Sequence, residues 1–229
     1  MQASEQASFI KNHLGPAFAA HSIDTKIIIY DHNPDRTDYP IAVLNDSAAR
    51  RYVDGSAFHL YGGSIDDLST VYYAHPDKKI YFTEQWIGAP GNFPSDLAWH
   101  IKLLFIGGTR NWCSNVLEWN LASDQNLEPH TPGGCNQCLG AVMIVGNTVI
   151  RNPAYYIIAH ASKFIRPGSV RIASSVVAAL PNAAFKRADG KIVLLVLNDS
   201  QSSQVFKIAL KGKETLTFLP AGAVGTYVL

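Results

Sequence analysis

The 229-residue sequence is poor in charge, in cysteine and in long apolar runs. Only 16% of its residues are charged and 47% are hydrophobic, whereas about a quarter of an ordinary soluble domain is charged. This composition excludes a disordered chain, because the apolar surface is ample for a core. No apolar run approaches the roughly 20 residues of a membrane-spanning helix. The net charge of +1 comes without a basic block, which argues against nucleic acid as a partner.

The small number of cysteines limits the roles that they can have in this protein. Three cysteines are an odd count, so a disulfide framework is excluded. Cys135 and Cys138 form a CxxC without a second pair or a nearby HxxxH, so no zinc site is expected. The pair follows Gly133-Gly134 in a loop rather than a helix start, which disfavours a thioredoxin-like redox motif. A short local disulfide and two free thiols both remain open, as does the state of Cys113.

Charge is distributed unevenly along the chain. Residues 1–150 hold nine basic and fifteen acidic residues, a net charge of −6, whereas residues 151–229 hold ten and three, a net charge of +7. The N-terminal residues include Glu5 and Gln6, where a signal peptide has an apolar core. The charge break predicts two unlike pieces, and from these residues we expect no signal peptide in this chain.

The first 165 residues alternate between two kinds of segment. Short β-branched or apolar runs predict strands, and the longer stretches between them have helical spacing. The first run, Ile27–Tyr30, does not alternate with polar residues, which predicts a strand buried on both faces. Strand–helix units of this kind favour a parallel sheet. The predicted strands are 27–30, 55–61, 79–82 and 115–117, and the predicted helices are 3–14, 41–53, 65–74 (N-capped by Ser64), 95–105 (N-capped by Ser95) and 153–164.

From Gly168 onward, short strands alternate with turns. The dipeptide Asp189-Gly190 between two apolar runs is a strong hairpin signal. This region predicts an antiparallel module of the sandwich type. Its predicted strands are 170–175, 183–186, 192–197, 204–210, 215–218 and 224–228.

Polar and aromatic residues gather where each predicted parallel strand ends. In parallel α/β structures the carboxyl ends of the strands build the site, because the loops converge there. Carboxylates beside aromatic rings suit sugars, whose C–H faces stack on rings and whose hydroxyls bind acids. The candidate site residues are Asp31, His32, His59, Tyr61, Glu84, Trp86, Glu118, Trp119 and Asn120.

The same segments resemble a known family. Tyr81–Trp86 resembles the nucleophile strand of glycoside hydrolase family 30, which includes glucosylceramidases and β-1,6-glucanases. Phe58–Tyr61 is similar to its His-x-Tyr strand, and Leu117–Ala122 to its Trp-Asn-Leu-Ala strand. Asn152–Gly168 resembles the last barrel helix and its exit into the β domain. The match runs in order along essentially the whole chain.

The resemblance implies a fold and a chemistry. The expected fold is the C-terminal half of a (β/α)8 TIM barrel over residues 1–166, with an antiparallel β-sandwich over 167–229. Glu84 would be the nucleophile of a retaining β-glycosidase that needs no metal or cofactor. The substrate-binding residues would be Asp31, His32, His59, Tyr61, Trp86, Glu118, Trp119 and Asn120. A retaining enzyme also needs a second carboxyl, roughly 5 Å from the nucleophile, to protonate the leaving oxygen.

That second carboxyl is where the sequence departs from the family. The family carries it in an Asn-Glu-Pro motif at the end of the fourth strand, and no Asn-Glu-Pro occurs here. Asn126-Leu127-Glu128-Pro129 contains an extra Leu and lies after the last predicted parallel strand. The predicted helix 3–14 resembles the segment just after the fourth strand. We therefore expect the acid/base to be absent from this chain, which would lower turnover by about 10²–10⁴-fold.

The resemblance leaves several functions open. The first expectation is a glucosylceramidase-like β-glucosidase, inactive alone as a fragment. The alternatives are an endo-β-1,6-glucanase, favoured by the Cys135–Cys138 loop, and a non-catalytic sugar-binding or structural fragment. A redox protein using the CxxC is a third class. Family habit implies an extracellular or periplasmic location, and unpaired strand edges near Ile27–Tyr30 and Val116–Leu117 predict self-association or pairing with an N-terminal half.

Overall fold

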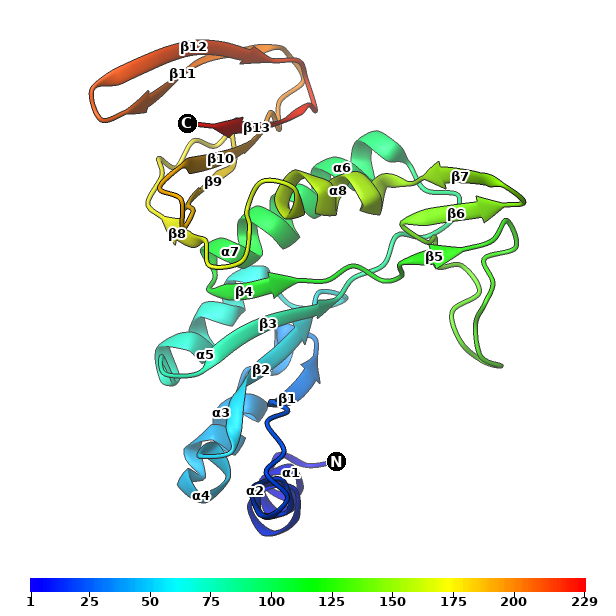
Figure 1. Ribbon diagram of the computed structural model, residues 1–229, viewed down its shortest axis with the longest axis vertical. Coiled ribbons are helices and arrows are strands. Elements are labelled where there is room, and N and C mark those ends of the chain that lie inside the picture. The colour runs from blue at the N-terminus through cyan, green and yellow to red at the C-terminus, as the bar shows by residue number, and fades with distance from the viewer. The chain divides into compact units, whose positions relative to one another are not determined.

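The structure, a computed structural model, describes residues 1–229 and divides them into two compact units (Figure 1). The first unit comprises Met1–Gln85 and Gly107–Leu117. The second comprises Trp86–Ile106 and Glu118–Leu229. None of the helices in either unit is both long and apolar enough to cross a membrane.

The first unit is built on a four-stranded parallel sheet. The strands are neighbours in chain order, β1-β2-β3-β4, with a helical segment between successive strands. The predicted parallel sheet is therefore confirmed. The strands are β1 (Ile27–His32), β2 (Val53–His59), β3 (Lys79–Glu84) and β4 (Cys113–Val116).

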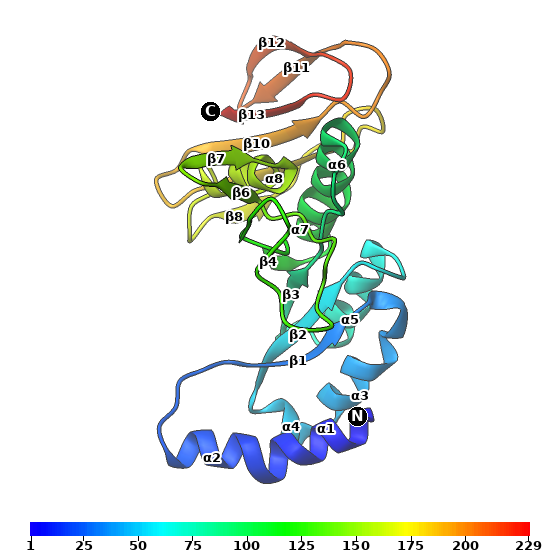
Figure 2. The ribbon, with the colours of Figure 1, turned by 90° about the vertical axis from the view of Figure 1, so that its right-hand side faces the viewer.

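The helix at the N-terminus is longer than predicted. The prediction that it ends at Leu14 is wrong, because the helix continues through Gly15 and Pro16 (Figure 2). A π-helical turn shifts the hydrogen-bond register, and the Gly15 N–H donates to the carbonyl of Ile10. Pro16 then falls in a first turn, where its missing N–H costs little. The segments are α1 (Ala3–Phe9), the π-helical turn Ile10–Leu14 and α2 (Gly15–Ala20).

The single helix predicted over residues 41–53 is two helices. Asp46 separates them, and its carboxylate accepts hydrogen bonds from the N–H groups of Ala48 and Ala49 at 3.0 and 3.2 Å. An aspartate in this position starts a new helix by satisfying its free donors. In the next helical segment Ser64 is the N-cap, as predicted. The remaining helices of the unit are α3 (Asp38–Asn45), α4 (Ser47–Arg50), α5 (Leu68–Ala74, after the 3₁₀ turn Ile65–Asp67) and α7 (Gly108–Arg110).

One face of β1 is covered by helices and the other is not. Ile27 and Ile29 belong to a core that includes Ile10 of the N-terminal helix and Leu44 of α3. Ile28, between them, is 39% exposed. The prediction that this strand is buried on both faces is therefore wrong. Successive side chains point to opposite faces of a strand, and here the helices cover only one of them.

The second unit begins with two helices and a small sheet. Helix α6 (Phe93–His100) continues into the π-helical segment Ile101–Gly107, and α8 (Pro153–Ser162) packs against α6. The N-cap of α6 is Asn92, which accepts from the N–H of Ser95 at 3.2 Å, so the prediction of Ser95 as the cap is wrong. The region expected to be a loop contains β5 (Ala122–Ser123), β6 (Val142–Val145) and β7 (Thr148–Arg151).

The C-terminal strands form one sheet and one hairpin. The sheet has the order β13-β10-β9-β8, and the antiparallel hairpin is β11-β12. The predicted hairpin at Asp189-Gly190 joins β9 to β10, with Gly190 at φ 86°, which favours glycine. The strands are β8 (Val170–Ile172), β9 (Asn182–Lys186), β10 (Ile192–Leu197), β11 (Gln204–Leu210), β12 (Lys213–Leu219) and β13 (Val224–Val228).

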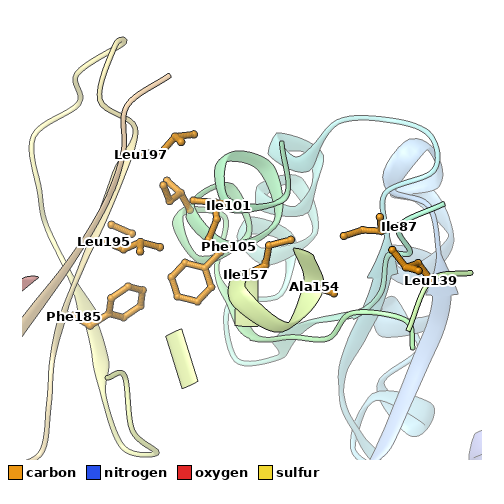
Figure 3. Packing of buried hydrophobic residues seen from close by; sticks show 11 residues of the cluster. Ile87, Ile101, Phe105, Leu139, Ala154, Ile157, Phe185, Leu195 and Leu197 are labelled. Carbon is orange, nitrogen blue, oxygen red and sulfur yellow. The ribbon is translucent and has the colours of Figure 1, made fainter. Parts of the chain in front are cut away.

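A single core joins these helices to the C-terminal sheet. Phe185, Leu195 and Leu197 of the sheet face Ile101 and Phe105 of the helical segment, with Ile157 of α8 beside them (Figure 3). Because of this packing, α6 and α8 belong to the same compact unit as the sheet. The compact units thus follow packing rather than chain order, and the domain boundary expected at residues 166 and 167 stays a prediction.

Candidate active site

Glu84 lies at the last position of β3 in the first unit. Its Oε1 accepts a hydrogen bond from the phenol of Tyr61 at 3.1 Å, and Nδ1 of His59 lies 3.7 Å from the same oxygen. The Glu84 side chain is 34% exposed. The carboxylate is therefore accessible from solvent and held by a neighbour from the end of β2, as a nucleophile requires.

Asp31 holds the other side of the His59 ring. Its Oδ1 lies 3.2 Å from Nε2 of His59 and accepts a hydrogen bond from the Thr83 hydroxyl at 2.6 Å. Tyr30 and Asp31 have positive φ values of 74° and 68°, and the pairing of β1 with β2 shifts register between Tyr30 and His32. A bulge of this kind at a strand end turns a side chain toward a site, at a cost in backbone strain.

Three further residues, none of them among the predicted site residues, support the site. The Asn33 side-chain oxygen accepts from the Tyr61 N–H at 2.9 Å, and the Asn33 carbonyl accepts from the Tyr30 phenol at 2.6 Å. Thr83 is the third such residue, through its bond to Asp31. The position of Thr83 next to Glu84 in the sequence could have marked it as a site residue. Its hydrogen-bond partner Asp31, however, lies 52 residues away along the chain.

His32 lies at the margin of this cluster. Its ring centroid is 6.3 Å from that of His59 in an edge-on arrangement, and the rings of His59 and Tyr61 are 5.9 Å apart. The predicted residues Asp31, His32, His59, Tyr61 and Glu84 are thus brought together in the first unit.

The other predicted residues lie in the second unit. Trp86 and Trp119 are joined by an isolated parallel β-bridge, and the Trp119 side chain is 48% exposed. The Oδ1 atom of Asn120 is buried without a hydrogen-bond partner, while its backbone carbonyl accepts from Ala141 at 2.8 Å. Trp119 is therefore the residue of this group that presents an open ring.

The side chain of Glu118 is buried and has a histidine partner. Both of its carboxylate oxygens lie close to Nδ1 of His100, at 2.9 and 3.0 Å, and its side chain is only 3% exposed. Burial raises the pKa of Glu118, although the hydrogen bond and charge of His100 act in the opposite direction. In this structure the carboxylate is enclosed with a histidine partner, and a substrate-binding role for Glu118 stays a prediction.

The CxxC is a local disulfide between Cys135 and Cys138, one of the two alternatives left open by the sequence. Backbone hydrogen bonds connect this loop to the segment after Trp86: the Ala89 N–H donates to Gln137, and the Leu139 N–H donates to Ile87. Cys113 is a buried free thiol, and burial raises its pKa. Among the 229 residues, no group of three or more His, Cys, Asp or Glu side chains is placed to hold a metal ion.

The Asn126–Pro129 segment forms a turn in the second unit. The Asp124 N–H donates to the Glu128 carbonyl at 2.8 Å, and the Glu128 carboxylate pairs with His130 at 3.2 Å. Half of the Glu128 side chain is exposed.

The Glu84 carboxylate, with its phenol donor, lies at the carboxyl end of the parallel sheet, where α/β structures build their sites. Residues 1–165 match the glycosyl hydrolase family 30 TIM-barrel domain, and residues 168–227 match the family 30 beta sandwich domain. The chain belongs to glycoside hydrolase family 30, a family of glycosidases. Its fold is a portion of the family's TIM barrel followed by the β-sandwich domain.

The chain is also similar to individual proteins of the family. The chain is 34% identical to endo-1,6-beta-D-glucanase neg1 of Aspergillus fumigatus, over 98% of this chain and 47% of that protein. It is 32% identical to putative glucosylceramidase 1 of Caenorhabditis elegans, over 86% of this chain and 40% of that protein. The solved structure of the endo-beta1,6-glucanase BT3312 superposes with a TM-score of 0.92 at 34% identity, covering all of this chain and 54% of that one. The chain spans about half the length of the curated relatives it matches.

Proposed function

We propose that the chain is part of a retaining endo-β-1,6-glucanase and carries its nucleophile, Glu84. The glucanase relatives from fungi support this choice of substrate, with 34% and 38% identity for two of them. The first expectation from the sequence, a glucosylceramidase-like activity, has weaker support: putative glucosylceramidase 1 of Caenorhabditis elegans is 32% identical over 86% of this chain, whereas the Aspergillus glucanase is 34% identical over 98% of it. We therefore propose the endo-β-1,6-glucanase, the alternative expected from the sequence, in place of the glucosylceramidase.

The hydrogen bond from Tyr61 to Glu84 carries the proposal. A carboxylate that attacks the anomeric carbon must keep one oxygen oriented while the other forms the new bond. The Tyr61 phenol holds Oε1 at 3.1 Å. Hydrogen bonds to a charged partner are stronger than neutral ones, so this contact fixes the carboxylate effectively.

In the proposed reaction Glu84 forms an ester bond to the anomeric carbon as the glycosidic bond breaks. The electron pair of that bond leaves with the aglycone oxygen, which then needs a proton. The 229 residues contain no Asn-Glu-Pro, and the Glu128 carboxyl is paired with His130 in a turn. We infer that no residue of this chain supplies the proton, so natural glucans are cleaved slowly by the chain alone.

A reagent that needs no proton donor tests the nucleophile directly. 2,4-Dinitrophenyl 2-deoxy-2-fluoro-β-glucoside has a leaving group that departs as an anion, and it traps the ester on the attacking carboxylate. Intact-mass and peptide-mass analysis should find one fluoroglucosyl group on Glu84. The Glu84→Gln variant should not react, whereas Glu128→Gln, a control at an exposed glutamate, should react like the parent. Labelling at another residue, or none at all, would contradict the proposal and favour a non-catalytic fragment.

The choice between substrates is tested by protection. Gentiotriose, a β-1,6-linked glucose trimer, should slow labelling of Glu84 at concentrations where glucosylceramide in detergent micelles does not. A protein that prefers the sphingolipid should show the reverse order. This comparison uses the trapping reaction as its readout, so it does not depend on turnover.

We also propose that the protein works outside the cytoplasm, in an extracellular or periplasmic space. The Cys135–Cys138 disulfide supports this location, because disulfides persist in oxidising compartments and are rare in the reducing cytosol. Fractionation of the source cells, followed by detection with an antibody, tests the proposal. Recovery of the protein in the cytoplasmic fraction alone would overturn it.

A further inference from the structure

A buried acid–imidazole pair in the second unit has no role in the proposed bond-breaking step. His100 is the last residue of α6, and its Nδ1 lies 2.9 and 3.0 Å from the two carboxylate oxygens of Glu118. The two side chains are 6% and 3% exposed. Enclosing ionisable groups this fully costs free energy, and apolar residues of similar size often stabilise a fold better. The pair therefore calls for an explanation other than packing.

Buried and exposed side chains alternate along the segment that begins at Glu118. The side chains of Glu118 and Asn120 point inward, as shown by the buried carboxylate and the buried Oδ1 atom. The side chains of Trp119 and Leu121 are 48% and 82% exposed. Glu118 directly precedes Trp119 in the chain, so the enclosed Glu118 carboxylate holds the backbone from which the exposed Trp119 indole projects.

The backbone on the C-terminal side of Trp119 is held by two hydrogen bonds. The carbonyl of Asn120 accepts from Ala141 at 2.8 Å, and that of Leu121 accepts from Val142 at 3.1 Å. On the N-terminal side of Trp119, both carboxylate oxygens of Glu118 lie within hydrogen-bond distance of His100. The indole of Trp119 thus projects from a segment that is held on both sides, and one of the two anchors is the buried pair.

We propose that His100 and Glu118 are positioning residues that fix the Trp119 indole as a platform for the sugar ring. The proposal rests on the proposed function, because it takes Trp119 to bind a glucosyl unit. A fixed ring loses little side-chain entropy when a sugar stacks on it, so a mobile ring binds more weakly.

The test is a double-variant cycle read out by sugar affinity. Affinity for gentiotriose is measured by isothermal titration calorimetry on the full chain. Glu118→Leu removes the hydrogen-bond acceptor of His100. It should weaken gentiotriose binding by about tenfold, as expected for the loss of a bond to a charged partner. In a Trp119→Ala background the same change should have no further effect, because the pair acts through Trp119. Glu118→Gln keeps an acceptor for Nδ1 and should bind within about threefold of the parent.

A matched control comes from the exposed glutamate–histidine pair in the same unit. Glu128 pairs with His130 at 3.2 Å, and Glu128→Leu removes that contact without touching the Glu118 segment. Its gentiotriose affinity should equal that of the parent. If Glu118→Leu fails to fold, His100→Phe/Glu118→Leu replaces both partners with apolar groups and should keep the fold. That double variant should still bind about tenfold more weakly.

A second readout does not involve sugar. The difference in fluorescence between each protein and its Trp119→Phe counterpart isolates the Trp119 signal. Loss of the pair should lower the anisotropy of this signal and increase its quenching by acrylamide. If the pair has a purely structural role, its loss should lower the melting temperature of the protein and leave the Trp119 signal unchanged.

The outcomes separate the two proposals. If the parent protein does not bind gentiotriose, or if Trp119→Ala binds as well as the parent, the proposed function of Trp119 fails. The anisotropy measurement then still decides whether the pair positions the ring. If Trp119→Ala weakens binding but Glu118→Leu does not, or if the loss persists undiminished in the Trp119→Ala background, the positioning proposal is overturned alone.

Discussion

The phenol of Tyr61 donates a hydrogen bond to Oε1 of Glu84 at 3.1 Å, although the residues lie 23 positions apart, at the ends of neighbouring parallel strands. Replacing Tyr61 by Phe should slow the fluoroglucoside labelling of Glu84 by about tenfold, because a bond to a charged group contributes roughly 1.5–3 kcal/mol. The rate is measured by intact-mass analysis over time. Tyr73→Phe is the matched control, since Tyr73 is 69% exposed in the same unit and should leave the rate unchanged.

The Thr83 hydroxyl bonds to Asp31 at 2.6 Å and thereby holds the carboxylate that faces His59. Thr83→Val keeps the shape of the side chain and removes the donor. The labelling rate should fall about threefold to tenfold, while the free energy of unfolding changes by about 1 kcal/mol. Thr83→Ser retains the hydroxyl and should behave like the parent. Equal rates for the Val and Ser variants would show that the contact is dispensable.

Asp54 should make the stability of the first unit depend on pH. Burial raises its pKa, but the hydrogen bonds from Tyr81 and Lys79 and the nearby lysine charges outweigh burial and lower it below 3.8. The same surroundings raise the pKa of Tyr81 to about 12, through burial and through Asp54. A carboxylate with a lowered pKa stabilises the fold above its unfolded value, and this stabilisation is lost as the pH falls through the folded value.

Asp54→Asn should therefore cost about 1–2 kcal/mol at pH 7, with the difference from the parent closing as the pH falls below 3.8. Urea unfolding at several pH values measures this difference. A cost that stays constant from pH 7 down to pH 3 would mean that ionisation of Asp54 is not its source.

The Cys135–Cys138 disulfide closes a short loop, so its effect on stability should be modest. Loop-closure entropy predicts that Cys135→Ala/Cys138→Ala lowers the free energy of unfolding by about 2 kcal/mol. A reducing agent should shift the parent by a similar amount and leave the variant unchanged. Alkylation gives an independent check, because buried Cys113 should react only after unfolding. Alkylation of all three cysteines in the native, unreduced protein would contradict the pairing.

The sheet of the first unit ends in two edges, β1 and β4. Unpaired edges promote association between chains, and a charged side chain on an edge strand opposes it. Ile28 on β1 is 39% exposed, so Ile28→Lys should reduce self-association without loss of the core. Size-exclusion chromatography with light scattering should show oligomers of the parent and a larger monomer fraction for the variant. A monomeric parent at high concentration would refute the prediction.

Much of the fold was predictable because it depends on local pattern. The β-branched runs and the turn residues determine which segments are strands, and Asp189-Gly190 determines the β9–β10 hairpin. The hairpin of β6 and β7 was missed, since its strands follow a long stretch rich in Gly and Pro that reads as a loop. The helix boundary at Asp46 was missed because Asp46 interrupts an otherwise helical stretch by capping a new helix.

The candidate site was predictable in its residue types and less so in their roles. Placing Asp31, His59, Tyr61 and Glu84 together required only the rule that parallel strands direct their carboxyl ends to one edge. That rule says nothing about which way a given side chain turns. Glu118 also follows the end of a strand, β4, yet it points inward to His100, a residue of α6 that no local pattern connects to it.

By itself, the sequence determined the parallel sheet, the antiparallel C-terminal strands, the family and the identity of the carboxylate proposed as nucleophile. These depend on periodicity and short motifs, which neighbouring residues specify. Only the tertiary structure decided that Thr83 and His59 meet at Asp31, that Ile28 stays exposed and that Glu118 is enclosed. The physical reason is that burial and hydrogen-bond partners depend on residues distant in the chain, which the fold alone brings within a few ångströms of one another.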